Sequence, residues 1–267
     1  VQIALAWLRT LALRILMMGD VIGKPGRSAI KELVEPLRSE LSLDFVIANG
    51  ENAAGGYGIT LDIVHELQNC GVDVITSGNH IWDQKEIIPY MDSGIPLIRP
   101  ANYPDAPGSG CFVTGDLLVV NLMGRVFMPA LDCPFRTVDR VLEEMTKDHS
   151  YKAIVVDFHA EATSEKQGMG WYLDGRVSAV VGTHTHVGTV DARVLTDGTG
   201  FVTDVGMTGP VNSVIGSDIE SVLGRFLSGM PRRLAVAAGP VMMNSVLIEI
   251  DDYGKAKSVE RIDRKVE

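Results

Sequence analysis

Short apolar runs recur along the chain, and each one ends in a small group of polar residues. The five runs occupy residues 14–18, 44–48, 72–76, 153–157 and 177–181. Their length and their content of β-branched residues predict buried strands. Layered α/β proteins place their sites at the carboxyl ends of parallel strands, so we expect these polar groups to lie close together.

Helical periodicity separates the first strands. Residues 25–41 begin with proline and carry apolar side chains at helical spacing, which predicts a helix. Residues 61–69 and 84–91 predict two shorter helices. The resulting β-α-β-α-β order predicts a largely parallel sheet with helices packed on it.

The second half of the chain has a different pattern. It predicts a hairpin over 111–114 and 117–121, a helix over 137–147, a strand over 201–204, a glycine-rich loop, a helix over 218–227 and a strand over 241–250. Short antiparallel strands after a parallel half indicate a second sheet packed on the first. We therefore expect an α/β fold with two stacked mixed sheets flanked by helices. One domain would span residues 14–267, with residues 1–13 as an extension outside the core.

Composition narrows the function classes. The net charge is −10, from 24 basic and 34 acidic residues, and such a chain is a poor candidate for wrapping the phosphates of duplex nucleic acid. Three cysteines without CxxC spacing argue against a disulfide framework or a zinc knuckle, and favour thiols in a reducing cytoplasm. We find no apolar run near the roughly 18 residues of a membrane span.

The polar groups at the strand ends indicate metal chemistry. The candidate residues are Asp20, Glu51, Asn52, Asn79, His80, His159, His184 and His186. Carboxylates, amide oxygens and imidazoles together suit manganese, iron or zinc better than magnesium alone. The two histidines of the His-x-His segment, on a chain leaving a strand, would project to one side. The whole set predicts a two-metal hydrolase centre.

Some of these residues have a second interpretation. Asp20 and Glu51 could each cap a helix instead, although a carboxylate after an apolar strand is costly unless it is paired or coordinated. Glu161, Ser164 and Glu165 follow His159 and could either contact the site or lie on a solvated loop. Residues 99–110 and 124–135 are candidate pocket walls, by position only.

These motifs resemble the calcineurin-like metallophosphoesterase superfamily. Ile22 stands where that pattern has its first histidine, and Glu51 stands where it has a bridging aspartate. With those departures, the runs 19–27, 49–56, 159–166, 182–187 and 203–210 resemble one bacterial subfamily, the YmdB-type phosphodiesterases. The likeness covers nearly everything from Arg14 onward.

The resemblance implies a four-layer α/β/β/α sandwich and two divalent or mixed-valence metal ions, with iron or manganese favoured and zinc as an option. It assigns one metal to Asp20, Glu51 and His186, the second to Glu51, Asn79, His159 and His184, an adjacent ligating or orienting role to Asn52, and the general acid to His80.

The resemblance also implies a substrate and a setting. The substrates would be small phosphodiesters, namely 2′,3′-cyclic nucleotides, with RNA ends as a further option. The protein would be a cytoplasmic homo-oligomer without a membrane partner. Two alternatives stay open: a phosphomonoesterase or nucleotidase of the same fold, and a regulatory nucleotide-binding protein with incidental turnover.

Overall fold

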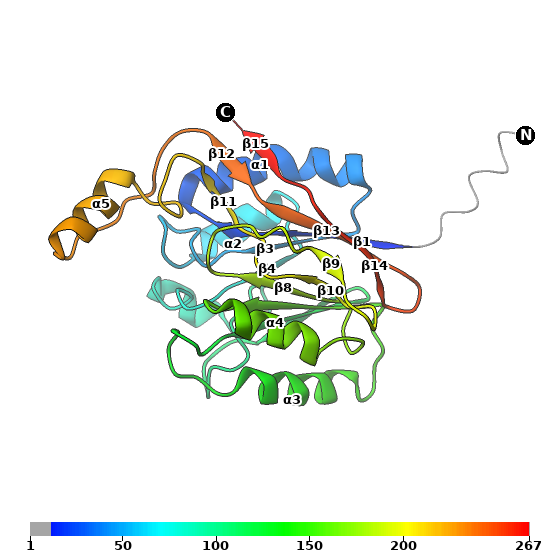
Figure 1. Ribbon diagram of the computed structural model, residues 1–267. Coiled ribbons are helices and arrows are strands. Elements are labelled where there is room, and N and C mark those ends of the chain that lie inside the picture. Colours follow the sequence, from blue (N-terminus) through cyan, green and yellow to red (C-terminus); the bar gives the residue numbers. More distant parts are fainter. Residues whose placement is uncertain (1–11, 267) are drawn as a thin grey trace, which may run out of the picture.

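The computed structural model describes residues 12–266 and contains two large stacked sheets (Figure 1). The first has the strand order β14-β13-β1-β3-β4. Strands β1, β3 and β4 are parallel, as predicted, whereas β13 pairs antiparallel with β1, and β14 pairs antiparallel with β13. Their bounds are β1 Leu13–Met18, β3 Phe45–Asn49, β4 Val74–Thr76, β13 Ser245–Ile250 and β14 Ala256–Arg261.

The second sheet has the strand order β5-β6-β7-β8-β10-β9. Its four inner strands are parallel, and the edge strands β5 and β9 are antiparallel to their neighbours. The predicted hairpin is confirmed as β5 and β6. The bounds are β5 Cys111–Thr114, β6 Leu117–Met123, β7 Ala153–His159, β8 Ala179–Thr183, β9 Arg193–Val194 and β10 Gly200–Val202.

The layers follow from the strand period of two. Ile15 and Met17 of β1 face the second sheet and pack in one core with Val155 of β7, whereas Leu16 and Met18 face the helices. Helices α1 (Gly23–Leu41) and α2 (Leu61–Asn69) cover the first sheet. Helices α3 (Pro134–Thr146) and α4 (Thr163–Tyr172) cover the second (Figure 1). The predicted order of layers, helix, sheet, sheet and helix, is confirmed.

A third, smaller sheet was not predicted. It has the order β15-β12-β11-β2 and comprises β2 Asp20–Val21, β11 Met207–Pro210, β12 Val241–Met243 and β15 Arg264–Val266. Gly19 joins β1 of the first sheet to β2 of this sheet, and Asn244 joins β12 to β13. At this crossing the Gly19 N–H donates to the Asn244 carbonyl at 3.0 Å. A Cβ on Gly19 would lie 1.9 Å from the Gly206 carbonyl oxygen, so the crossing requires glycine there. The strand predicted over 241–250 is therefore two strands in different sheets, and the predicted glycine-rich loop contains β11.

Two further predictions differ from the structure. The helix expected over 84–91 is the 3₁₀ helix η1 (Lys85–Tyr90), which contains Pro89; proline lacks the N–H that an α-helix needs. Helix α4 was missed because it contains Gly168 and Gly170, which weaken its helical signal. Strand β1 begins at Leu13, within the predicted extension, and residues 1–11 of that extension lie outside the described residues.

Helix α5 (Ile219–Ser228) stands apart from these layers and projects from one end of the molecule (Figure 1). It begins where the Asp218 side chain accepts from the Ser221 N–H at 2.9 Å, and it ends at Gly229 in the left-handed region. Among the described residues, none of the helices has both the length and the apolar content needed to cross a membrane.

Candidate metal centre

The predicted site residues converge where the strands of both large sheets end. Asp20 is the first residue of β2 in the third sheet, two residues after β1 ends. Glu51 follows β3 of the first sheet, and His159 is the last residue of β7 in the second. These three side chains are at most 1% exposed. The convergence is the one expected from the polar groups at the strand ends.

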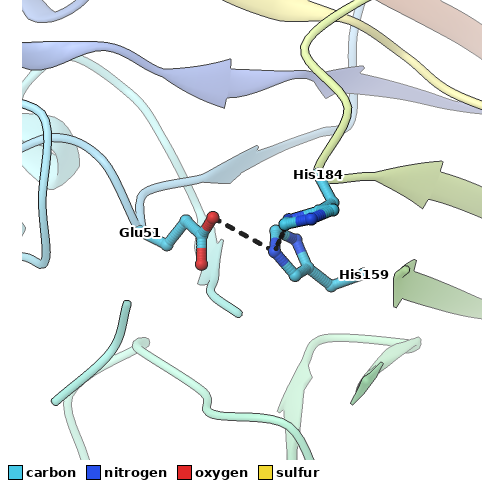
Figure 2. Close-up of side chains that lie close together, drawn as sticks. All are labelled: Glu51, His159 and His184. Atoms are coloured by element: carbon cyan, nitrogen blue, oxygen red, sulfur yellow. Dashed lines mark hydrogen bonds and ion pairs between the residues drawn. The ribbon is translucent and has the colours of Figure 1, made fainter. Parts of the chain in front are cut away.

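Four of the predicted residues form a compact cluster, which we call the two-histidine group: Glu51, Asn79, His159 and His184. The His159 Nε2 atom lies 3.1 Å from Glu51 Oε1, 3.1 Å from Asn79 Oδ1 and 3.0 Å from His184 Nδ1. Figure 2 shows Glu51 and the two imidazoles facing one another. One ring nitrogen cannot satisfy three such partners, whereas a cation accepts nitrogen and oxygen donors together.

A second cluster, the aspartate group, consists of Asp20, Glu51 and His186. One ligand atom from each residue lies within 4.8 Å of the others. Asp20 Oδ1 is 3.9 Å from His186 Nε2, and this buried oxygen has no hydrogen-bond partner within residues 12–266. An unpartnered buried carboxylate oxygen is costly, and a cation would satisfy it. Glu51 belongs to both groups, so its two oxygens could serve two cations.

The His159 ring is held by a chain of buried polar groups. Its Nδ1 lies 2.9 Å from Thr183 Oγ1, and the Thr183 hydroxyl donates to Asp157 Oδ1 at 2.7 Å. Thr76 also donates to Asp157, through its hydroxyl. Because Thr183 uses its own proton on Asp157, it accepts from His159 Nδ1–H. That leaves His159 Nε2 as the nitrogen that can bind a cation.

The other two histidines are oriented in the same way. His184 Nε2 lies 3.2 Å from Glu161 Oε2, and His186 Nδ1 lies 2.8 Å from the Ile215 carbonyl oxygen. His186 Nδ1 therefore donates to the Ile215 carbonyl, and the Glu161 carboxylate lies beside the outer nitrogen of His184. The inner nitrogen of each ring faces its group. Glu161 thus contacts the site, which resolves the two interpretations left open for it.

A buried ion pair supports the segment that carries these two histidines. Lys166 Nζ lies 2.5 Å from Asp204 Oδ2, and both side chains are 1% exposed. The same Asp204 oxygen accepts from the Thr185 hydroxyl at 2.8 Å. The backbones of His184 and His186 have φ values of 101° and 64°, in the left-handed region. The extended geometry behind the His-x-His prediction is therefore wrong, and the anchored Thr185 holds a strained turn that directs each histidine to a different group.

Gly78 allows the backbone before Asn79 to lie close to His159 and Glu51. A Cβ there would lie 2.3 Å from His159 Nε2 and 2.4 Å from Glu51 Oε2. Any side chain at this position would push Asn79 and the rest of its loop away from the cluster.

Burial and charge shift the protonation of the cluster strongly. Burial raises the pKa of Asp20 to about 6, against the opposing charges of His186 and His159. Burial would also raise the pKa of Glu51, but the charge and hydrogen bond of His159 outweigh it and lower that pKa to about 2. The same contact overcomes burial at His159 and raises its pKa to about 9. Burial and neighbouring His159 lower the pKa of His184 to about 3. The carboxylate of Glu51 therefore requires a positive charge beside it.

His80 belongs to neither group. Its Nδ1 lies 2.8 Å from Asp83 Oδ2, and its ring lies edge-on to Tyr57 with 5.1 Å between centroids. Its backbone N–H donates to Glu51 Oε2 at 3.1 Å. Asn52 is also adjacent: its Nδ2 donates to the Gly56 carbonyl at 2.9 Å, and its buried Oδ1 has no partner among the described residues.

A cavity of about 370 Å³ opens beside the cluster and is lined in part by Asn52, His80 and His186. Its other walls come mainly from residues 214–226 and 234–236. The prediction that 99–110 and 124–135 would form the pocket walls is wrong for this cavity, since neither segment contributes to it.

Sequence reasoning also missed Asp157, Thr183 and Asp204. Each is a polar residue in or next to an apolar strand, and Thr183 and Asp204 also lie within the runs that carry the family resemblance. That position suggests burial but does not reveal the partner.

Comparison with known proteins gives consistent matches over almost the whole chain. The family of YmdB-like proteins matches residues 16–262. The Bacillus subtilis (strain 168) protein named 2′,3′-cyclic-nucleotide 2′-phosphodiesterase is 50% identical over 256 residues, which cover 94% of this chain and 96% of that protein.

Two solved structures have the same fold as this chain over almost its whole length. A hypothetical protein from Thermus thermophilus has a TM-score of 0.89 and 41% identity, covering 96% of this chain and 100% of its own. A Mycoplasma pneumoniae protein described as a novel phosphatase has a TM-score of 0.89 and 32% identity, covering 96% of this chain and 94% of its own. The chain therefore belongs to the family of YmdB-like proteins.

Proposed function

We propose that this protein is a metal-dependent phosphodiesterase that hydrolyses 2′,3′-cyclic nucleotides. The observation that carries the proposal is the sharing of Glu51 between two groups of donor residues at the strand ends. Two cations that share a carboxylate are typical of enzymes that displace groups at phosphorus. The name of the Bacillus subtilis relative supports the choice of substrate.

The metal ligands follow the two groups. Asp20, Glu51 and His186 would hold one ion, and Glu51, Asn79, His159 and His184 would hold the other, with the unpartnered oxygen of Asn52 beside them. Ions bound there supply Lewis acidity and lower the pKa of water. The donors are nitrogen and oxygen without thiolate, so iron or manganese is favoured and zinc is the alternative.

His80 is the general acid. Asp83 accepts from its Nδ1–H, which leaves Nε2 for the cavity that His80 lines. Water adds to phosphorus and releases one proton to solvent, the bond from phosphorus to the ribose 2′ oxygen breaks, and His80 gives its Nε2 proton to that oxygen and regains a proton from solvent. Tyr57 packs against the ring and limits its rotation.

Further parts of the proposal concern substrate range and setting. RNA ends that carry the same cyclic phosphate are an additional substrate, and the protein works in the cytoplasm as a homo-oligomer. A phosphomonoesterase of the same fold is the second candidate, because the matching Mycoplasma pneumoniae structure is described as a phosphatase.

The test compares substrates with two kinds of leaving group, p-nitrophenolate and the ribose 2′ oxygen. Metal-stripped protein receives manganese, iron or zinc and is assayed with bis-p-nitrophenyl phosphate, p-nitrophenyl phosphate and 2′,3′-cyclic AMP. We expect metal-dependent turnover of the two diesters. His80→Ala keeps its metal content and loses about 10²-fold in turnover of 2′,3′-cyclic AMP. It loses less with the p-nitrophenyl diester, whose leaving group needs no acid.

The matched control is His65→Ala, which removes an exposed histidine on α2. It should behave as wild type. Preference for the monoester would favour the phosphatase, and equal losses on both diesters would exclude His80 as the acid.

A further inference from the structure

The cavity beside the cluster has walls unlike those of the cluster itself. Its floor is apolar and includes Val214, Val222 and Val236, and its aromatic residues are Tyr57 and Phe226. Phe226 is 73% exposed, although a phenylalanine next to a cavity is normally covered. At about 370 Å³ the cavity lies within the 300–1,000 Å³ or so of small-ligand sites.

The cavity is continuous with the candidate metal centre. His80 and His186 form part of its lining, and so does Ile215, whose carbonyl accepts from His186 Nδ1 at 2.8 Å. A phosphate held at the aspartate group would therefore have the rest of its molecule in this cavity.

The charge of the cavity is also distinctive. Among the described residues that line it, Arg225 is the one lysine or arginine, and none is an aspartate or glutamate. In a chain with a net charge of −10, a wall without carboxylates is compatible with an anion. Val222, Arg225 and Phe226 are spaced i, i+3 and i+4 on α5, so one helix face presents apolar, cationic and aromatic groups together.

We propose that this cavity binds the nucleoside of the substrate and that Arg225 binds a phosphate on the 5′ oxygen of the same ribose. This inference rests on the proposed function. When the cyclic phosphate lies at the metal centre, the base and the 5′ carbon extend away from it. The base then packs against Tyr57 and Phe226, and aromatic packing of this kind tolerates any base.

The 5′ phosphate can come from two sources with the same chemistry. One is a free nucleotide that carries both a 5′-phosphate and a 2′,3′-cyclic phosphate. The other is the 3′ end of an RNA chain, in which the 5′ oxygen belongs to the preceding phosphodiester. Arginine suits either, because its planar fork matches phosphate oxygens.

The experiment compares kcat/KM for three substrates: 2′,3′-cyclic AMP, its 5′-phosphorylated form, and the dinucleotide ApA ending in a 2′,3′-cyclic phosphate. Wild type should prefer at least one 5′-extended substrate by about tenfold, the effect of one charge-assisted hydrogen bond. Arg225→Met removes this preference and Arg225→Lys retains part of it. Preference for both extended substrates means that both sources serve, and preference for one identifies the source.

Product inhibition provides a second readout. Adenosine 3′,5′-bisphosphate should inhibit wild type more strongly than adenosine 3′-monophosphate, and Arg225→Met should remove the difference. The matched control is Arg140→Met, which changes an exposed arginine on α3 and should keep the wild-type preference.

The outcomes separate the two proposals. Metal-dependent turnover without a 5′ preference, or a preference that survives Arg225→Met, would overturn the subsite and leave the phosphodiesterase standing. Absence of turnover of bis-p-nitrophenyl phosphate and of all three nucleotides would overturn both.

Discussion

The two-histidine group and the aspartate group share Glu51 but differ in closeness and in donor number. In the first, His159 Nε2 lies within 3.0–3.1 Å of three partner atoms. In the second, Asp20 Oδ1 and His186 Nε2 are 3.9 Å apart, and that oxygen has no hydrogen-bond partner among the described residues. Glu51 is thus shared by two groups that differ in the number and spacing of their donors. We expect the aspartate group, which has fewer donors, to bind its ion more weakly.

Ile22 accounts for part of this difference in donor number between the two groups. It stands two residues after Asp20, where the superfamily pattern has a histidine, and it is 3% exposed. A Cβ on Gly209 would lie 2.8 Å from its Cγ1, so the side chain is closely packed. Where the superfamily pattern has a nitrogen donor, this chain therefore has an apolar side chain that lines the cavity.

The largest effect should come from removing the shared ligand. Glu51→Gln replaces a carboxylate that serves both groups, so both ions should be lost. Because two-metal catalysis supplies several kcal/mol, turnover should fall by more than about 10³-fold. Metal content by mass spectrometry and turnover of bis-p-nitrophenyl phosphate test this, with exposed Glu143→Gln as control. Retention of both ions would show that Glu51 is not shared.

The next prediction separates the groups. A titration of stripped wild-type protein with manganese should show a tight phase and a weak phase. His159→Ala should remove the tight phase and His186→Ala the weak phase, each lowering turnover by more than about 10²-fold. Exposed His149→Ala is the matched control. If both variants lose the same phase, the division into two groups is wrong.

Adding a nitrogen donor to the aspartate group should reduce the difference in metal affinity between the two groups. Ile22→His places an imidazole near the aspartate group, so the weak phase should tighten by about tenfold, or about 1.4 kcal/mol. The tight phase should not change. Isothermal titration with manganese measures both, and Ile22→Leu controls for disturbed packing. Tightening in the leucine variant as well would point to packing as the cause.

The smallest effect concerns pH. In stripped protein the raised pKa of Asp20, about 6 against 3.8, means that its stabilising contribution is lost as pH rises through that window, whereas the lowered pKa of His184, about 3 against 6.5, adds stability over the same range and opposes that loss. The raised pKa of His159, about 9 against 6.5, means that its stabilising contribution is lost as pH rises through that second window. The opposed contributions of Asp20 and His184 should leave Tm nearly constant through the lower window, and the loss at His159 should lower Tm by on the order of a few °C through the upper one.

Variants separate these contributions. Asp20→Asn should make Tm rise with pH through the lower window, because the contribution of His184 is then unopposed. His159→Gln should remove the fall in the upper window, and manganese should reduce the pH dependence because it competes with protons. A wild-type Tm that does not fall through the upper window would contradict the shift at His159, and an Asp20→Asn variant whose Tm does not rise through the lower window would contradict the opposed shifts there.

The order of elements was predictable because it depends on local patterns. The parallel strands and α1 (Gly23–Leu41) carry periods that neighbouring residues alone specify. The third sheet was not predictable, because it depends on a break at Gly19 and Asn244 that no local periodicity marks. Helix α4 (Thr163–Tyr172) was missed for a related reason: Gly170 is there to admit the ring of Phe201, a residue distant in the sequence.

The identity of the chemical groups at the strand ends is local information, and the parallel order of the strands made their convergence foreseeable. Their division into two groups depends on tertiary contacts: His184 and His186, two residues apart, belong to different groups because buried Asp204 holds Thr185 between them. Tertiary packing likewise set the nitrogen that each ring presents and placed Arg225 beside the cluster. These features depend on hydrogen bonds and contacts between segments far apart in the chain, and local periodicity carries no information about them.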